Sequence, residues 1–256
     1  MKLTRHQSPD ASVDSIPNGF RLTVLDGDNQ HYRVAQLDDY AKSARNALPH
    51  RTSLNLSLRA RASGGSIPGT WGFGLWNDPF GLSIGFGGNQ LRLPTLPNAI
   101  WFFHASEENY LSFSNPSTGS PGNGFLAQVF RSPILRFPVF SLKALARLVR
   151  VGLTLPFSRK KARASMNKIV EEQGVRLDVD VTEWHRYRFE WSSKRSAFWV
   201  DDTLALETSA SPNPPLGLVI WIDNQYAAWR PDGKIGFGVL ENTEPAWLEI
   251  EDLKSD

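Results

Sequence analysis

Hydrophobic and polar residues alternate along much of this chain. In the clearest run, residues 54–62, Leu or Ala occupies every second position. Because side chains on a β-strand point alternately to opposite faces, this run predicts a strand with one buried and one solvated face. Many short strands separated by turn residues are typical of an all-β, antiparallel two-sheet sandwich. Further strands are predicted at 20–25, 71–76, 81–86, 99–103, 110–113, 177–181, 218–222, 236–240 and 248–253.

Residues 184–202 predict a hairpin rich in aromatic side chains. Tyr187, Phe189 and Trp191 alternate with charged residues, which predicts a strand with an aromatic buried face. A polar turn follows, and a second strand is predicted at 197–200. By this alternation we assign three tryptophans to the core: Trp184, Trp191 and Trp199.

Residues 131–173 break the strand pattern and predict a helical insertion. Apolar residues recur there at helical spacing, with cations on another stripe of the same helix. We expect Pro156 to end this helix, and a second helix to follow at 162–173 with Gly174 as its C-cap. The apolar stripe is Leu142, Leu145, Val149 and Leu153, and the basic stripe is Lys143, Arg147 and Arg150.

The predicted domain organisation is simple. Residues 1–19 are polar and predict a flexible N-terminal tail, and residues 20–256 predict a single β-sandwich domain that carries the insertion. The tail lacks the apolar stretch of a secretory signal, and the chain has no cysteine. We therefore expect a cytoplasmic protein, peripheral at the membrane if the insertion contacts one.

The net charge of +2 hides a strong asymmetry. Residues 109–170 contain ten cations and no Asp or Glu. Such a segment predicts a lid over a cleft, a contact with an anionic membrane, or a solvated helix docked on the core. Nucleic acid is the least favoured partner, because no known binding motif accompanies the charge. The membrane or lid residues are Lys143, Arg147, Arg150, Arg159, Lys160 and Lys161.

Four stretches together resemble the family-16 glycoside hydrolases. Residues 184–202 (W-H-R-Y-R-F-E-W…F-W-V-D-D) are similar to the family hairpin W-H-x-Y-x-x-E-W…F-Y-V-D-G. Residues 58–76, 215–221 and 247–253 look like three further stretches of that family, in the same order along the chain. The resemblance implies a concanavalin A-like jelly roll whose substrate cleft is bordered by aromatic residues.

The resemblance fails at the family's catalytic strand, which reads G-E-I-D-I-M-E. Its outer two glutamates act as nucleophile and acid/base, and retaining hydrolysis needs them about 5 Å apart. The matching residues 80–88 read F-G-L-S-I-G-F-G-G, and residues 79–100 contain no Asp or Glu. We therefore expect the E-x-D-x-x-E motif, and the mechanism that it supports, to be missing.

The first functional hypothesis is non-hydrolytic binding of a carbohydrate, a glycolipid or another amphipathic ligand. Aromatic faces stack on sugar rings and pack against greasy ligands, so a tryptophan-lined cleft without carboxylates fits such a ligand. We expect no metal and no cofactor. The predicted ligand-binding residues are Trp71, Trp76, Ser83, Phe86, Trp101, Trp221, Asn224 and Trp229.

Two alternatives stay open. The chain is a divergent glycoside hydrolase, a lyase or an enzyme of a hydrophobic metabolite if acid/base residues have moved elsewhere, and Glu107, Glu108 and His104 are the weak candidates. It is a peripheral membrane module if the cleft is vestigial and residues 131–168 make the contact.

Overall fold

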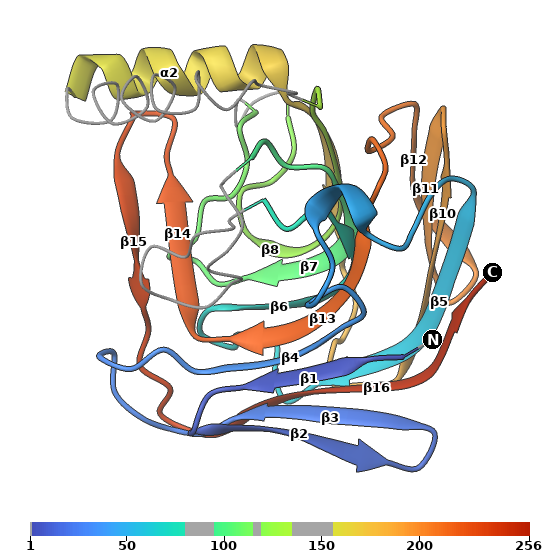
Figure 1. Cartoon of the computed structure of the whole chain (residues 1–256). Coiled ribbons are helices and arrows are strands. Elements are labelled where there is room, and N and C mark those ends of the chain that lie inside the picture. The colour runs from blue at the N-terminus through green and yellow to red at the C-terminus, as the bar shows by residue number, and fades with distance from the viewer. Residues whose placement is uncertain (1, 80–94, 115–118, 135–155) are drawn as a thin grey trace.

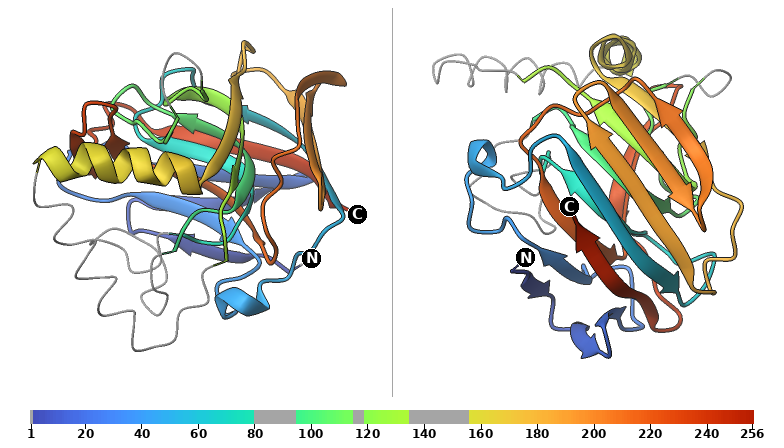
Figure 2. Two further views of the ribbon diagram at one scale, coloured as in Figure 1. Left: turned by 90° about the horizontal axis from the view of Figure 1, so that it is seen from above. Right: turned by 90° about the vertical axis from the view of Figure 1, so that its right-hand side faces the viewer.

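The computed structural model describes residues 2–79, 95–114, 119–134 and 156–256. Two seven-stranded antiparallel sheets pack face to face (Figures 1 and 2), which confirms the predicted sandwich. Sheet A runs in the order β1 (Thr4–Gln7), β4 (Val34–Asp38), β13 (Gly217–Asp223), β6 (Thr70–Trp76), β7 (Ala99–Ala105), β8 (Gly124–Arg131) and β9 (Glu171–Arg176). Sheet B runs β12 (Thr203–Thr208), β11 (Arg195–Val200), β10 (His185–Ser192), β5 (Leu54–Ala62), β16 (Ala246–Ser255), β3 (Gly19–Val24) and β2 (Ala11–Ile16).

Three smaller elements complete the described structure. A two-stranded ribbon is formed by β14 (Gln225–Trp229) and β15 (Ile235–Val239), and a short 3-10 helix, η1, spans Arg45–Ala47. The helix α2 (Pro156–Ile169) lies across one end of the molecule, beside the tip of the ribbon (Figure 1). Within the described part of the chain, no helix combines the length and the apolar character needed to cross a membrane.

Aromatic side chains fill the space between the two sheets. Phe102 of β7 contacts Tyr187 of β10 and Phe198 of β11, with ring centroids 5.0 Å and 5.3 Å apart, both edge to face. This geometry is the one that aromatic quadrupoles favour. The alternation in residues 54–62 sends Leu56 and Leu58 into the same core, where both are fully buried. The aromatic face of the hairpin therefore packs against sheet A, which confirms the prediction that this face is buried.

Two tryptophans of the hairpin region lie outside this core. Trp191 is buried in it, but Trp184 and Trp199 are half-buried on the outer face of sheet B. Trp199 pairs across the strands with Arg188, whose guanidinium lies 3.7 Å from the ring centroid. Directly paired residues point to the same face of a sheet. Because Arg188 points outward, Trp199 points outward too. The assignment of Trp184 and Trp199 to the core was wrong.

The predicted flexible tail, residues 1–19, forms strands instead. β1 pairs with β4, and β2 pairs with β3. Both are edge strands, and three of the four residues of β1 are exposed. An edge strand keeps polar residues because only one side of it pairs, so its composition resembles that of a loop.

The insertion differs from its prediction where the structure describes it. Pro156 begins α2 rather than ending a helix, which suits proline because the first helical residue needs no N–H partner. Residues 171–176 form the edge strand β9, so Gly174 lies inside a strand and not at a helix end. The first predicted helix, with Lys143, Arg147 and Arg150, lies outside the described residues.

Candidate functional site

The outer face of sheet A, which points away from sheet B, carries the candidate site. Strand β6 presents Gly72 and Gly74 to this face, and the side chains of Trp221 and Trp101 from the neighbouring strands lie close over them. A Cβ at Gly72 would lie 3.0 Å from Trp221 Cη2, and one at Gly74 would lie 2.5 Å from Trp101 Cβ. The glycines therefore let the two tryptophans pack directly against the sheet.

Four rings form what we call the aromatic cluster: Trp76, Trp101, Phe103 and Trp221. Trp76 and Trp221 are stacked, with centroids 6.1 Å apart and planes 6° from parallel. Trp101 and Phe103 each lie 5.6 Å from Trp221. Trp101 and Trp221 are only 6% exposed, whereas Trp76 is half-buried. Trp76 is thus the member of the cluster that a ligand in solution reaches first.

Each indole N–H of the cluster donates to a protein oxygen. Trp76 Nε1 donates to the Tyr40 hydroxyl at 2.6 Å, Trp101 Nε1 to Gln128 Oε1 at 3.2 Å, and Trp221 Nε1 to Thr70 Oγ1 at 2.9 Å. Buried indoles need such partners, and these bonds also fix the orientation of the rings. The cluster can therefore offer ring faces and edges, but not indole donors, to a ligand.

Glu172 is a buried carboxyl at the β9 edge of this face. Its Oε1 accepts from Gln128 Nε2 at 3.0 Å, and its Oε2 accepts from the backbone N–H of Phe113 at 2.8 Å and that of Ser114 at 3.3 Å. Burial raises the pKa of Glu172, while these hydrogen bonds oppose the shift. Gln128 also accepts from Trp101, so the carboxyl is linked to the aromatic cluster through one side chain.

Asp223 is a second buried carboxyl, at the end of β13. Its Oδ1 accepts from Thr70 Oγ1 at 2.7 Å and its Oδ2 from the Tyr32 hydroxyl at 3.2 Å. Burial raises the pKa of Asp223 to about 6, against the effect of these bonds. Burial and the nearby Asp223 also raise the pKa of Tyr32. Thr70 accepts from Trp221, so this carboxyl too is one residue from the cluster.

The register of sheet A shows that these two carboxyls cannot act on one bond. Asp223 pairs with Thr70, whereas Glu172 pairs with Phe130, so four strand spacings and six residues separate them. At the usual spacings this is about 25–30 Å, against about 5–10 Å for the acid/base pair of a glycosidase. Asp38 also faces outward but is paired with His6, 3.1 Å away. Asp38 pairs with Val219, so one strand spacing and four residues, or about 14 Å, separate it from Asp223. None of these three carboxyls therefore lies at the separation of a glycosidase acid/base pair from another.

Trp71 does not belong to the cleft face. It is 1% exposed in the core between the sheets, where its ring stacks on His104 (5.2 Å between centroids, 10° between planes). Trp71 and Trp76 are five positions apart on one strand, and residues an odd number apart point to opposite faces. The prediction that both line one cleft is thus corrected to Trp76 alone.

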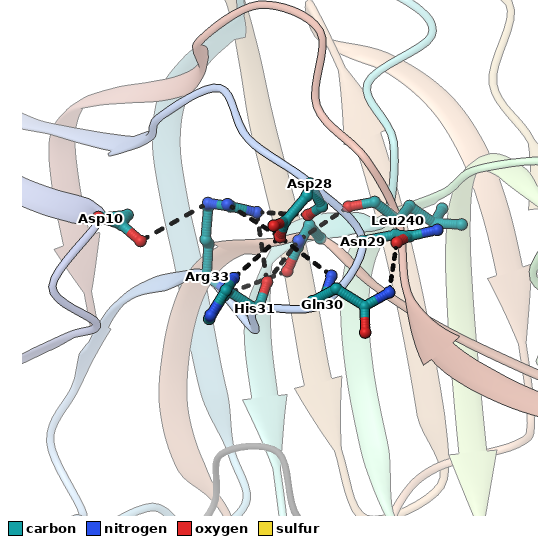
Figure 3. Close-up of polar contacts among 8 residues, drawn as sticks. Asp10, Asp28, Asn29, Gln30, His31, Arg33 and Leu240 are labelled. Atoms are coloured by element: carbon teal, nitrogen blue, oxygen red, sulfur yellow. Dashed lines mark hydrogen bonds and ion pairs between the residues drawn. The ribbon is translucent and has the colours of Figure 1, made fainter.

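Asn224 has a structural role. It is fully buried, its Oδ1 accepts from the Arg33 N–H at 2.8 Å, and its Nδ2 donates to the Leu240 carbonyl at 2.9 Å. Figure 3 shows the neighbouring loop wrapped around Arg33, whose guanidinium donates to the carbonyl of Asp28 at 2.8 Å. With its amide used by backbone groups, Asn224 has little left to offer a ligand.

The other predicted ligand-binding residues are dispersed. Trp229 is half-buried on β14, and its ring contacts Phe113, 6.3 Å between centroids, rather than the aromatic cluster. Ser83 and Phe86 lie outside the described residues. Gln128, Glu172 and Thr70, by contrast, lie beside the cluster without having been predicted.

The three weak catalytic candidates do not assemble. His104 points into the core, where burial lowers the pKa of its ring to about 4 and so keeps it neutral at pH 7. Glu107 and Glu108 are exposed on the turn after β7. A buried imidazole and two solvated carboxylates cannot share a substrate, which argues against chemistry at this place.

The described basic residues of α2 differ in burial and in contacts. Arg163 is 4% exposed, and its guanidinium donates to the carbonyls of Trp229, Ser112 and Ser114. It fastens α2 to the rest of the fold. Lys160 and Lys161 are exposed on the same helix, and Arg159 is half-buried.

Comparison with known proteins gives structural neighbours only. No protein-family model matches the chain, and no curated protein does. A glycosyl hydrolase family protein from Mycobacterium fortuitum is 14% identical over 100% of this chain and 91% of its own, with a TM-score of 0.47. LamAcat from Zobellia galactanivorans is 16% identical over 93% and 79%, with a TM-score of 0.46. A sialidase is 8% identical over 99% of this chain but only 17% of its own length, with a TM-score of 0.44.

Proposed function

We propose that this protein binds a carbohydrate or another amphipathic ligand on the outer face of sheet A and does not hydrolyse it. The observation that carries the proposal is the aromatic cluster, in which Trp76 is half-buried and stacked on the buried Trp221. A flat apolar surface backed by a fixed ring suits the face of a sugar or the apolar part of an amphiphile.

Two features support binding without hydrolysis. Asp223 and Glu172, the two buried carboxyls beside the cluster, are separated by far more than the distance at which an acid and a base act on one glycosidic bond. The stretch that matches the family's catalytic strand, within residues 79–100, has no acidic residue. A relocated acid/base pair is the alternative, and the separation of His104 from Glu107 and Glu108 counts against it.

The test is calorimetric titration with laminari- and cello-oligosaccharides, followed by a lipid-like probe such as lysophosphatidylcholine below its micelle concentration. We expect Trp76→Ala to weaken binding at least tenfold, the cost of about 1.4 kcal/mol that losing one stacked ring implies. Trp199→Ala is the matched control, because it removes an equally half-buried tryptophan from the opposite sheet. Equal affinities of the two variants, or no binding of any probe, would refute the proposal. Release of reducing sugar by the wild type would favour the enzyme alternative.

A second candidate function is contact with an anionic membrane, and the exposed Lys160, Lys161 and Lys168 of α2 favour it. Basic residues near a surface gain about 1 kcal/mol each from anionic lipid. Flotation with phosphatidylserine vesicles tests this contact, with phosphatidylcholine vesicles as the control. Charge reversal at Lys160 and Lys161 should abolish flotation, and unchanged flotation would exclude α2 as the contact.

A further inference from the structure

An open pocket of about 430 Å³ lies beside the edge strand β9, at the carboxyl end of α2. No member of the aromatic cluster lines it. The side chains that matter for its chemistry are Ser120 from a loop, Asn167 from α2 and Glu172 from β9, and Gly174 of β9 lies beside Ser120.

Ser120 gives the first sign that this pocket is a binding site. It is 4% exposed, and its hydroxyl has no hydrogen-bond partner in the described structure. Buried hydroxyls are normally paired, so an unpaired one that lines a pocket is a position for a ligand atom or a water. A Cβ at Gly174 would lie 3.1 Å from this hydroxyl, so the glycine keeps the space beside it open.

A second unpaired group lines the pocket. The carboxamide of Asn167 is exposed and makes no hydrogen bond to another described residue. The side chain of Gln173 is not a candidate, because Gln173 pairs with the core residue Val129 and so points to the other face of sheet A. A hydroxyl and a carboxamide can each donate and accept, which is what the hydroxyls of a polyol require.

The charges around the pocket exclude an anion as its ligand. Glu172 is a lining residue whose two oxygens already accept from Gln128, Phe113 and Ser114. The end of α2 nearest the pocket is the negative end of the helix dipole. A second lining carboxylate, Glu171, is paired with Arg131 at 3.3 Å on the surface. An anion would therefore be repelled, and a neutral ligand would meet only the unpaired groups.

We propose that this pocket is a second binding site, for a neutral polyhydroxylated molecule such as one sugar unit or a small polyol. Its volume lies within the range of about 300–1,000 Å³ that is usual for small-molecule sites. The proposal does not rest on the function assigned to the aromatic cluster, because the two sites share no lining residue.

The experiment is an amide-detected NMR titration of the ¹⁵N-labelled full chain with D-glucose, D-galactose and myo-inositol, each tested separately. We expect at least one of them to shift the signals of Gly119, Ser120 and Gly174 and the side-chain NH₂ signal of Asn167. The variant Asn167→Ala should weaken that binding at least tenfold. Lys168→Ala is the matched control, since it changes the neighbouring exposed residue of the same helix outside the pocket.

The outcomes separate the two sites. Trp76→Ala should leave the pocket titration unchanged. Loss of binding at the aromatic cluster therefore cannot be mistaken for loss of binding in the pocket. The proposal is overturned if none of the three probes shifts these signals, if the shifts lie elsewhere, or if Asn167→Ala binds like the wild type. Binding of a cationic amino sugar is tested with D-glucosamine, and a response to it alone would overturn the assignment of a neutral ligand.

Discussion

Glu172 and Arg163 both bind the backbone of Ser114, one at its N–H and the other at its carbonyl. The carboxylate of Glu172 accepts from the Ser114 N–H at 3.3 Å, and the guanidinium of Arg163 donates to the Ser114 carbonyl at 2.9 Å. Two buried, oppositely charged side chains are thus joined through backbone groups. This arrangement attaches α2 to the edge of sheet A.

The first prediction is that Arg163→Ala loosens α2. The change leaves three carbonyls without their donor, which we expect to lower the free energy of unfolding by about 2–4 kcal/mol. Urea unfolding measures the loss, and hydrogen exchange should increase in residues 111–114 and 156–169. Lys160→Ala, on the exposed side of the same helix, should change neither. Equal exchange in the two variants would mean that Arg163 does not hold the helix.

The second prediction concerns Asp223. Its pKa is about 6 in the folded protein and near 4 in the unfolded chain, so folding favours the protonated form. Its contribution is therefore fully present below pH 4 and lost as the pH rises through 6, by about 3 kcal/mol in all. As the pH rises from 4 to 7, the free energy of unfolding of Asp223→Asn should therefore increase by this amount relative to that of the wild type. Asp26→Asn, at an exposed turn, is the control, and parallel curves for all three proteins would contradict the prediction.

The third prediction concerns His104, whose contribution to stability changes with pH in the opposite direction. Burial lowers the pKa of His104 to about 4, so the unfolded chain binds this proton more readily. Stability from this group is present above pH 6.5 and lost as the pH falls towards 4, by about 3 kcal/mol. His104→Phe keeps a flat ring against Trp71 and should flatten the acid limb of a stability curve measured by urea unfolding. His31→Phe, at an exposed position, should leave that limb as steep as in the wild type.

The fourth prediction tests the packing of the aromatic cluster. Gly74→Ala would place a methyl group 2.4 Å from the Ile100 carbonyl oxygen and 2.5 Å from Trp101 Cβ, so the strand or the indole must shift. We expect a loss of about 1–3 kcal/mol in thermal or urea unfolding. Gly64→Ala is the matched control, since no atom lies within 4 Å of the added Cβ there. If Gly74→Ala leaves the stability unchanged, the aromatic cluster does not pack tightly against the sheet.

The sandwich could be predicted because the central strands of sheet B alternate cleanly. Residues 54–62 and the aromatic hairpin lie in the middle of sheet B, where one face is buried and the other solvated. The edge strands β1, β2 and β9 escaped prediction because half of their backbone groups face solvent and their side chains are mostly polar.

The site was only partly predictable for related reasons. Trp76, Trp101 and Trp221 do meet on one face, and counting positions along the strand would have excluded Trp71. Glu172 was missed because its segment was assigned to a helix, and no sequence pattern connects it to Gln128, 44 residues away. Such long-range pairs depend on strand order, which one sequence does not reveal.

The stacked rings of Trp76 and Trp221 also form a pair of coupled chromophores. Two indoles with centroids 6.1 Å apart are close enough for their electronic transitions to mix, which produces an exciton signal in circular dichroism. That signal depends on the distance and the angle between the rings. Because Trp101 lies 6.0 Å from Trp76 and 5.6 Å from Trp221, the signal reports the arrangement of all three indoles without a label.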